Sequence, residues 1–253
     1  QRWLDAGVNL DWKSWAEIPE NSIVGCWFSN ELVDALPVHL VTVEGGMLKE
    51  VYVTVSDEHF VEVTGEISTP RLGEYFGEVG VNLPSKAYPN EYRTEVNLAA
   101  LDWLETVSRR LRRGYLLTID YGYPAFKYYH PQRHEGTLKC YYQHRHHNNP
   151  YVNVGSQDIT AHVDFTALEV QGQSLGLEKV GFTKQGLFLM ALGLGDRLSE
   201  LSSGKLNLQE VLSRRNALHQ LIDPTGLGGF GVLIQGKGLE ERRFLRGLFQ
   251  ASF

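Results

Sequence analysis

The stretch SIVGCWFSNELVDALPVH, residues 22–39, decides the fold. Its apolar run Ile23–Phe28 ends abruptly in polar residues, a pattern typical of a strand that is covered on both faces, as in a parallel sheet. A second run of this kind, YLLTIDYG at 115–122, follows a helical pattern and a glycine. We therefore predict that Ile23–Phe28 and Tyr115–Ile119 are adjacent parallel strands of an α/β sheet.

Composition excludes several classes of protein. The chain has 253 residues, of which 42% are hydrophobic and 21% charged, with a formal net charge of −6. These values are typical of a globular protein and argue against disorder, a fibrous repeat or a dedicated nucleic-acid binder. The two cysteines are too few for a disulfide framework, and no apolar stretch reaches the ~18 residues of a membrane span. The first residues have neither an initiator Met nor a signal-peptide pattern, so we expect a fragment of a longer protein.

The rest of the chain alternates between strand and helix patterns. Residues 39–67 alternate with period two, which predicts an antiparallel meander with one wet face. Asn90 is a good N-cap, and the apolar stripe from there to Gly114 predicts one long helix. The other predicted elements are a strand at Val8–Trp12, a helix from Asp164 to Leu175, a strand near 178–183, helices at 187–201 and 206–221, a strand at 231–238 and a terminal helix.

The segment 123–163 has a different character. It is rich in Tyr, His, Pro and Asn and shows little periodicity. A stretch of this length without clear elements is usually a functional lid or a disordered loop, and its aromatic residues argue against disorder. Two interpretations stay open: a lid that closes over a substrate, and a static flap packed by its own aromatic rings.

The first candidate site follows the strand at 23–28. Polar Ser29, Asn30 and Glu31 stand where the carboxyl end of a strand places ligand-binding groups in open α/β sheets. Glu31 and Asp34 are three residues apart, so a helical turn would put both carboxylates on one face. Such a pair can grip a guanidinium or accept a proton. The alternative is that Asn30 and Asp34 are simple turn and cap residues.

The second candidate site is IDYGY at 119–123. Asp120 and Tyr121 also stand at the carboxyl end of a strand, and Gly122 allows a tight turn or a close backbone approach. An Asx turn that ends the strand would explain the same residues.

The third candidate site is GSQDITAHVDF at 155–165. It places Asp158, Thr160 and His162 just before Asp164, which is a suitable helix N-cap. This segment would then lead to a helix N-terminus, where anions are favoured. Helix capping alone is the simpler interpretation.

Two further patterns carry less weight. CYYQHRHH at 140–147 could supply Cys140, His144 and His146 to zinc, with His147, His130 and His134 nearby, but no standard ligand spacing is met. We therefore predict a cationic aromatic loop and no metal. GLGGFG at 226–231 matches a dinucleotide fingerprint by letter, yet it precedes a strand where the fingerprint should follow one.

The three candidate sites together are more specific than any one of them. In their order and spacing, SNELVDALPVH, RGYLLTIDYG and GSQDITAHVDF resemble the MidA-like family of class I S-adenosylmethionine-dependent methyltransferases. That family includes a protein arginine methyltransferase of mitochondrial complex I assembly. The resemblance extends from about Val8 to the strand at 231–236, nearly the whole chain.

The resemblance implies the C-terminal part of a doubly wound, mostly parallel α/β sheet with an inserted antiparallel meander. Its Gly-rich donor loop and ribose-binding acidic residue would lie upstream, so this chain alone is expected to be inactive. The implied segments are central strands at 1–38, the meander insertion at 39–88, a core helix and strand at 89–122, the lid at 123–163 and C-terminal helices and strands at 164–253.

The resemblance also implies roles for the candidate residues. Ser29 and Asn30 would contact S-adenosylmethionine, and Asn30 would lie next to the transferred methyl group. Glu31 and Asp34 would face an acceptor guanidinium. The remaining acceptor-side residues would be Asp120, Tyr121, Asp158, Thr160 and His162.

The implied function is methylation of an arginine in a respiratory-complex subunit or its bacterial equivalent. The protein would act in the bacterial cytoplasm or the mitochondrial matrix, without nucleic acid or a membrane span, and could form a homodimer through the meander at 39–67. The alternative is an assembly or binding protein that keeps the fold without the chemistry.

Overall fold

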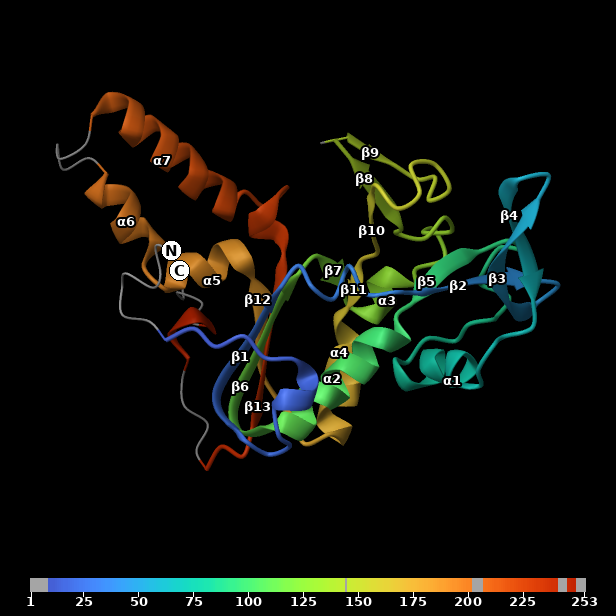
Figure 1. Ribbon diagram of the computed structural model, residues 1–253, viewed down its shortest axis with the longest axis horizontal. Coiled ribbons are helices and arrows are strands. Elements are labelled where there is room, and N and C mark those ends of the chain that lie inside the picture. The colour runs from blue at the N-terminus through green and yellow to red at the C-terminus, as the bar shows by residue number, and fades with distance from the viewer. Residues whose placement is uncertain (1–8, 144, 202–206, 241–244, 249–253) are drawn as a thin grey trace.

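The computed structural model describes residues 9–143, 145–201, 207–240 and 245–248, and its main body is a four-stranded sheet in the order β1-β6-β13-β12 (Figure 1). The bounds of these strands are β1 Ile23–Asn30, β6 Leu111–Asp120, β13 Gly231–Lys237 and β12 Glu178–Lys184. Strand β1 pairs in parallel with β6, which confirms the first prediction. Strand β13 is antiparallel to both β6 and β12, so the sheet is mixed, and the doubly wound arrangement stays a prediction.

Strands β1 and β6 approach each other closely at a pair of glycines. Gly114, which the sequence predicts to end a helix, lies inside β6 opposite Gly25 of β1. A Cβ atom on Gly114 would lie only 1.8 Å from the Gly25 carbonyl oxygen, and the φ of Gly114 is +140°. Glycine is therefore required here by the strand pairing.

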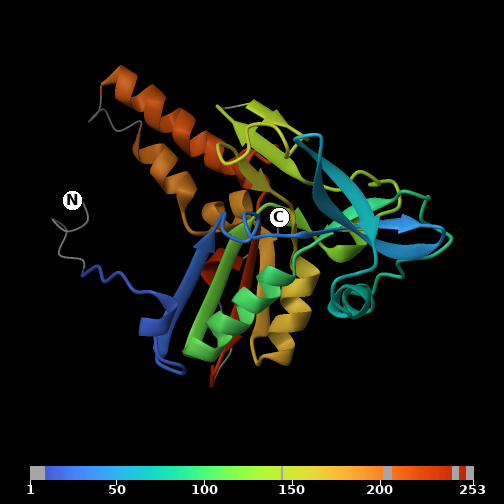
Figure 2. The same ribbon diagram turned by 45° about the vertical axis from the view of Figure 1, so that its right-hand side comes forward.

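Helices cover both faces of the main sheet (Figure 2). Helices α2 (Leu98–Arg110) and α4 (Phe165–Ser174) pack on one face, where Leu104, Leu116 and Leu168 are buried together. Helix α5 (Gln185–Ala191) and a short turn at Arg246–Leu248 cover the other face.

The helix expected at 187–201 is interrupted. Gly193, with a φ of 100°, separates α5 from α6 (Leu194–Glu200). Helix α6 and helix α7 (Leu208–Ile222) project away from the main sheet in Figure 1. The helix expected at 206–221 is thus present as α7. Of the expected terminal helix at 239–250, residues 239, 240 and 245–248 are described, and among them only Arg246–Leu248 forms a helical turn.

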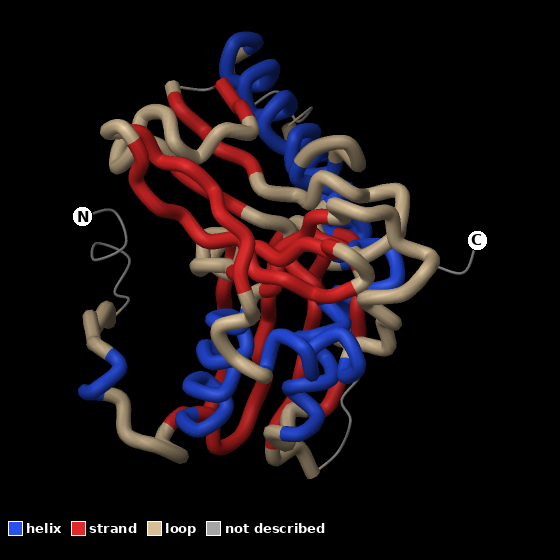
Figure 3. The backbone as a smooth tube through the Cα atoms, turned by 90° about the vertical axis from the view of Figure 1, so that its right-hand side faces the viewer, coloured by secondary structure: helices blue, strands red, loops and turns tan. Residues whose placement is uncertain are grey.

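The meander forms a second sheet beside the first. Its strands, in the order β4-β3-β2-β5, are all antiparallel, and Figure 3 shows them at the front of the molecule. Their bounds are β2 His39–Glu44, β3 Met47–Ser56, β4 His59–Gly65 and β5 Arg93–Val96. Helix α1 (Arg71–Glu78) packs against the inner face, which buries Val41, Val43 and Val96.

The prediction of a helix from Asn90 is wrong for its first residues, because residues 93–96 form strand β5. Residues 93–96 pair with β2, and α2 begins only after Asn97, whose side chain accepts a hydrogen bond from the Ala100 N–H at 2.8 Å. Thr94, Glu95 and Val96 are all buried, and pairing with a distant strand overrides the helical pattern. The strand expected at Val8–Trp12 is also wrong for residues 9–12, which form no regular element, while Val8 lies outside the described residues.

The segment 123–163 is more ordered than its sequence indicates. It contains helix α3 (Ala125–Tyr128) and an antiparallel sheet in the order β10-β8-β9. The bounds of these strands are β8 Lys139–Tyr142, β9 Arg145–His147 and β10 Asp158–Thr160. A short parallel pair, β7 (Gly122–Tyr123) and β11 (Val163–Asp164), joins the segment to the main body. The prediction that this segment has no clear elements is therefore wrong.

One buried carboxylate fastens this segment to the meander. Glu95 of β5 is 2% exposed. Its carboxylate accepts hydrogen bonds from the N–H groups of Thr137 and Leu138 at 2.9–3.1 Å and from the Tyr128 hydroxyl at 3.1 Å. These donors offset the cost of burying the charge, because charge-assisted hydrogen bonds are strong in a low dielectric.

We predict that Glu95→Gln lowers the free energy of unfolding by about 1–3 kcal/mol, because an amide NH₂ would face N–H donors and leave them unpaired. Urea denaturation measures this change. The matched control is Glu135→Gln, since Glu135 is exposed on the same edge and should change stability by less than ~0.5 kcal/mol. Equal stability of Glu95→Gln and the wild-type protein would show that the carboxylate does not anchor the segment.

Candidate functional site

The carboxyl ends of β1 and β6 are joined by the side chain of Asp120. This side chain is fully buried. One carboxylate oxygen accepts hydrogen bonds from the N–H groups of Val33 and Asp34 at 3.1 and 3.3 Å, and the other accepts one from the Tyr121 N–H at 2.9 Å. Asp120 therefore holds the turn that follows β1 against the end of β6.

The turn places two carboxylates at the sheet edge. Glu31 has a φ of 47°, a sparsely populated conformation for a residue other than glycine, and its N–H bonds to the Ile119 carbonyl oxygen. Asp34 is 5% exposed, and its Oδ1 is buried with no hydrogen-bond partner among the described residues. Residues 31–34 do not form the helical turn that was expected, but both carboxylates still line the same cavity.

The cavity has a volume of about 1180 Å³ and brings the three candidate sites together. Six of the eight residues predicted as catalytic line it: Glu31, Asp34, Tyr121, Asp158, Thr160 and His162. Asp120 lies behind the wall and acts on the turn, while Asn30 is exposed beside the cavity with its amide 3.4 Å from Glu31. The roles of these residues stay predictions.

Several buried polar atoms around the cavity lack hydrogen-bond partners within the described part of the chain. They are Asp34 Oδ1, Thr160 Oγ1, His162 Nδ1 and Gln157 Oε1. An unpaired buried polar atom is costly, so such atoms mark places where a ligand or water supplies the missing bond. The cavity can therefore offer both acceptors and a hydroxyl to a polar guest.

Burial shifts the pKa of the groups that face or support the cavity. Desolvation, and then the Asp34 carboxylate, raises the pKa of Asp120 to about 7. Burial, and then the charges of Arg133 and Lys139, lowers the pKa of His162 to about 4. At neutral pH His162 is therefore neutral, with one ring nitrogen free to accept a hydrogen bond.

Aromatic rings fill the wall around His162. Its ring stands edge-on to Tyr121 and Tyr123, each at 5.1 Å between centroids. Tyr121 also packs against Phe230 at 5.4 Å. Burial, and then Asp34, raises the pKa of Tyr121 well above its usual range, so its hydroxyl stays protonated as a hydrogen-bond donor.

Sequence reasoning missed part of the lining. The segment 123–163 supplies Lys139, Tyr141, Tyr142 and His146, and Phe230 comes from the loop GLGGFG. That loop precedes β13, as expected, and its Phe230 lines the cavity. The aromatic content of 123–163 was a usable signal for the lid, whereas nothing local distinguishes Phe230 from a core residue.

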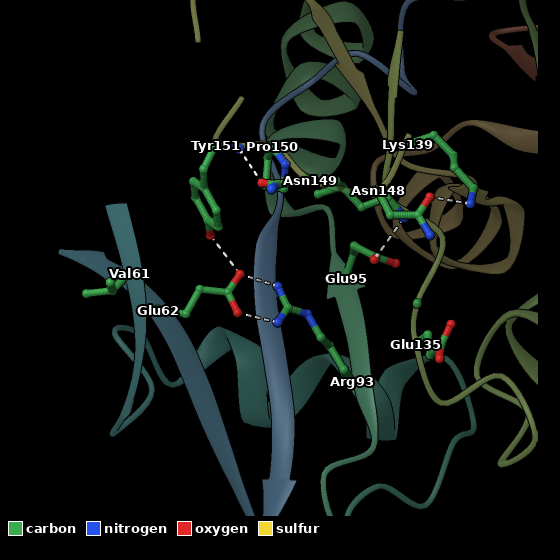
Figure 4. A pocket seen from close by; sticks show the side chains of 12 residues that line it. Val61, Glu62, Arg93, Glu95, Glu135, Lys139, Asn148, Asn149, Pro150 and Tyr151 are labelled. Atoms are coloured by element: carbon green, nitrogen blue, oxygen red, sulfur yellow. Dashed lines mark hydrogen bonds and ion pairs between the residues drawn. The ribbon is translucent and has the colours of Figure 1, made fainter. Parts of the chain in front are cut away.

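A second, smaller pocket of about 510 Å³ lies between β4, β5 and the loop at 148–151 (Figure 4). One pair of its charges is joined internally. Arg93 makes two hydrogen bonds to Glu62 at 2.5 and 2.6 Å, and the Tyr151 hydroxyl donates to Glu62 at 2.7 Å. Lys139 lines both this pocket and the larger cavity.

The histidine-rich segment shows no metal cluster in the described residues. No three His, Cys, Asp or Glu side chains converge there, and His144 lies outside the described part. Cys140 is buried in β8, and burial raises the pKa of its thiol, which disfavours the thiolate that zinc requires.

Comparison with known proteins identifies the chain's relatives. Residues 2–183 match a family described as "Putative S-adenosyl-L-methionine-dependent methyltransferase". The chain is similar to the mitochondrial protein arginine methyltransferase NDUFAF7 homologs of two animals. It is 29% identical to that of Drosophila melanogaster, over 79% of this chain and 44% of the relative. It is 30% identical to that of Caenorhabditis elegans, over 92% of this chain and 50% of the relative. The chain thus spans about half the length of these curated relatives.

Solved structures give the same result. A likely methyl transferase from Burkholderia thailandensis, bound to S-adenosyl-homocysteine, is 34% identical with a TM-score of 0.81 over 91% of this chain and 57% of that one. A second structure from the same organism, of an uncharacterized protein, is 35% identical, with a TM-score of 0.79. The match covers 88% of this chain and 57% of that one. No helix among the described residues is long and apolar enough to cross a membrane. The chain belongs to this family of S-adenosylmethionine-dependent methyltransferases, and its cofactor is S-adenosylmethionine.

Proposed function

We propose that this chain forms the acceptor side of a protein arginine methyltransferase. The observation that carries the proposal is the pair of carboxylates, Glu31 and Asp34, in one cavity with an unpaired Asp34 Oδ1. A guanidinium offers planar N–H donors that match two carboxylates, and the aromatic walls suit its flat face and aliphatic stem. The names of the NDUFAF7 homologs support arginine as the acceptor.

The residues of this chain would act by orientation and by handling one proton. S-adenosylmethionine supplies an electrophilic methyl group when it is bound. Glu31 and Asp34 would hold the guanidinium so that one nitrogen points at that carbon, which is the main requirement of an in-line displacement. The alkylated nitrogen then loses a proton, and an adjacent carboxylate can accept it. His162 and Tyr121 would keep water out of the inner wall of the cavity.

The end of β1 fits the edge of a donor site. Ser29 is 4% exposed, and its Oγ is buried without a partner in the described residues. Asn30 is exposed directly beside it. We therefore propose that Ser29 and Asn30 contact S-adenosylmethionine, and that its main loop belongs to a part of the whole protein outside these residues, which would leave this chain inactive alone. The doubly wound sheet of the whole enzyme belongs to the same proposal.

We further propose that the acceptor is a subunit of a respiratory complex or its bacterial equivalent. The word mitochondrial in the relatives' names supports the matrix as the location in a eukaryote, with the cytoplasm as the bacterial counterpart. We also propose the division of the chain into core strands, meander, lid and C-terminal segments. Residues 93–96 belong to the meander in this division, because they pair with β2.

We predict that Glu31→Gln lowers methyl transfer by the whole protein by about 10- to 100-fold, because it removes a charge-assisted hydrogen bond worth roughly 1.5–3 kcal/mol. Glu91→Gln is the matched control, since Glu91 is also exposed and has a similar φ of 63°. Its activity should equal that of the wild-type protein, and both variants should keep the wild-type melting temperature. Full activity of Glu31→Gln would assign Glu31 a structural role.

The same assay separates the enzyme from the alternative, an assembly protein that keeps the fold. We expect the whole protein to bind S-adenosylmethionine and to transfer its methyl group to arginine peptides. Binding of an acceptor without any transfer would instead favour the non-catalytic protein.

A second prediction concerns pH. The raised pKa of Asp120 means that the folded state holds a proton between pH 3.8 and about 7 that the unfolded state has lost. Its contribution to stability is therefore present at low pH and is lost as the pH rises through 7, by at most ~1.4 kcal/mol per pH unit. Ionisation adds negative charge behind Asp34, so binding of N-acetylarginine amide should strengthen from pH 6 to pH 8.

Titration calorimetry at several pH values measures this binding, and urea denaturation measures the stability. Asp120→Asn is the control because it has no proton to lose, so both of its pH profiles should lack the step near pH 7 that Asp120 gives the wild-type protein. A wild-type profile parallel to that of Asp120→Asn would assign the titration to another group.

We also predict a homodimer through the meander. The β3–β4 ribbon exposes Val53 at 50%, Val55 at 63% and Phe60 at 46%, and such a face is usually covered. Analytical ultracentrifugation should show a dimer that Val55→Lys converts to monomer, while Lys49→Gln on the same ribbon leaves it unchanged. A monomer at high concentration would exclude this interface.

A further inference from the structure

Two cations share one aromatic ring beside the cavity. The Lys127 ammonium and the Arg133 guanidinium each lie 4.6 Å from the centroid of the Tyr123 ring. They can therefore be no further apart than twice that distance. Two like charges this close repel each other, while each is attracted to the face of the ring.

These cations have no acidic partner among the residues that the structure describes. Some cations elsewhere do have such a partner, as Arg93 has Glu62 and Arg71 has Asp102. Around Tyr123 the bonds of the neighbouring lysines go to neutral groups, from Lys139 to the Asn148 amide and from Lys184 to the Gly229 carbonyl. In a chain with a net charge of −6, this is an uncompensated positive region.

The positive region is continuous with the candidate active site. The Tyr123 ring stands against His162, which lines the cavity together with Lys139. Two nitrogens at this junction, Arg133 Nε and His162 Nδ1, are buried without a hydrogen-bond partner in the described residues. An oxyanion here would pair the Arg133 nitrogen and lie between the cations.

We propose that Lys127 and Arg133, beside His162, bind a carboxylate of the acceptor protein. This inference rests on the proposed function and adds a selection rule: the methylated arginine has an acidic residue near it in the acceptor. The guanidinium would enter between Glu31 and Asp34, and the acidic residue would reach the cations on the far side of His162. Such an arrangement fixes the direction of the acceptor as well as its position.

The site is tested first without any arginine or methyl transfer. N-acetylaspartate amide is titrated against the protein at constant ionic strength while the ring signals of His162 and Tyr123 are followed by NMR. We expect saturable shifts with a millimolar dissociation constant and none with N-acetylasparagine amide. Equal shifts from both probes would overturn the proposal. Inorganic phosphate is the third probe, and binding of phosphate more than tenfold tighter than the carboxylate would assign the site to a phosphate ligand instead.

Matched variants identify the residues. Lys127→Gln/Arg133→Gln should weaken carboxylate binding at least tenfold, while Lys86→Gln/Arg112→Gln, which removes two exposed cations elsewhere, should leave it unchanged. The single variant Lys127→Gln and the charge-conserving Arg133→Lys guard against loss of the fold, with weaker binding expected only for Lys127→Gln. Wild-type affinity in the folded double variant would refute the assignment.

Peptides then connect the site to the acceptor. Peptides carrying one arginine and one aspartate, separated by one to four glycines, should bind at least tenfold more tightly than the same peptides with asparagine. The double variant should lose this preference and keep the affinity for the asparagine peptides. If no peptide binds while N-acetylaspartate amide still does, the arginine acceptor is rejected and the anion site is kept. If the peptides bind without a preference for aspartate, only the selection rule is rejected.

Discussion

The site depends on the three hydrogen bonds that the buried Asp120 carboxylate accepts from Val33, Asp34 and Tyr121. A turn after an edge strand has N–H groups that no neighbouring strand can pair, and an unpaired buried donor is costly. Asp120 pairs two of these donors from the end of β6, so the turn is held in one conformation. That conformation sets where Asp34 points and holds Glu31, at its unusual φ, beside it.

A second buried carboxylate fixes the opposite wall. Glu95 binds Thr137 and Leu138 directly before β8, and β8 in turn carries Lys139 and Tyr141 to the cavity. Both carboxylates are surrounded by donors from distant parts of the chain. Rigid support of this kind is what allows a cavity built largely from loops to keep a defined shape. The meander therefore contributes to the site through Glu95, although none of its strands lines the cavity.

The parts of the fold that depend on local pattern could be predicted, and those that depend on distant pairing could not. The apolar runs of β1 and β6 each carry their own signal, so their parallel pairing was predicted correctly. Residues 93–96 form a strand only because β2 lies beside them, and Glu95 has a role only because residue 137, 42 positions away, folds against it. Glu31, Asp34 and Tyr121 reached one cavity because the carboxyl ends of the neighbouring strands β1 and β6 meet at one edge. Asp158, Thr160 and His162 come from β10 of another sheet and the residues after it, and Phe230 precedes β13, so their place depends on the whole topology.

The distribution of charge around the cavity limits what can bind there. Acidic groups on the turn after β1 line the cavity, and cations without an acidic partner among the described residues lie beyond His162, so the two sides of His162 carry opposite charge. His162 separates them, and its low pKa keeps this boundary neutral at physiological pH. A ligand with a single positive charge would gain from one side only, whereas a segment carrying both signs would gain from both and would be held in one direction. Because a segment bound on one side is already held near the other, the second contact adds to the first only when the spacing of the two charges fits, so the cavity favours an acceptor by that spacing and not merely by the presence of an arginine.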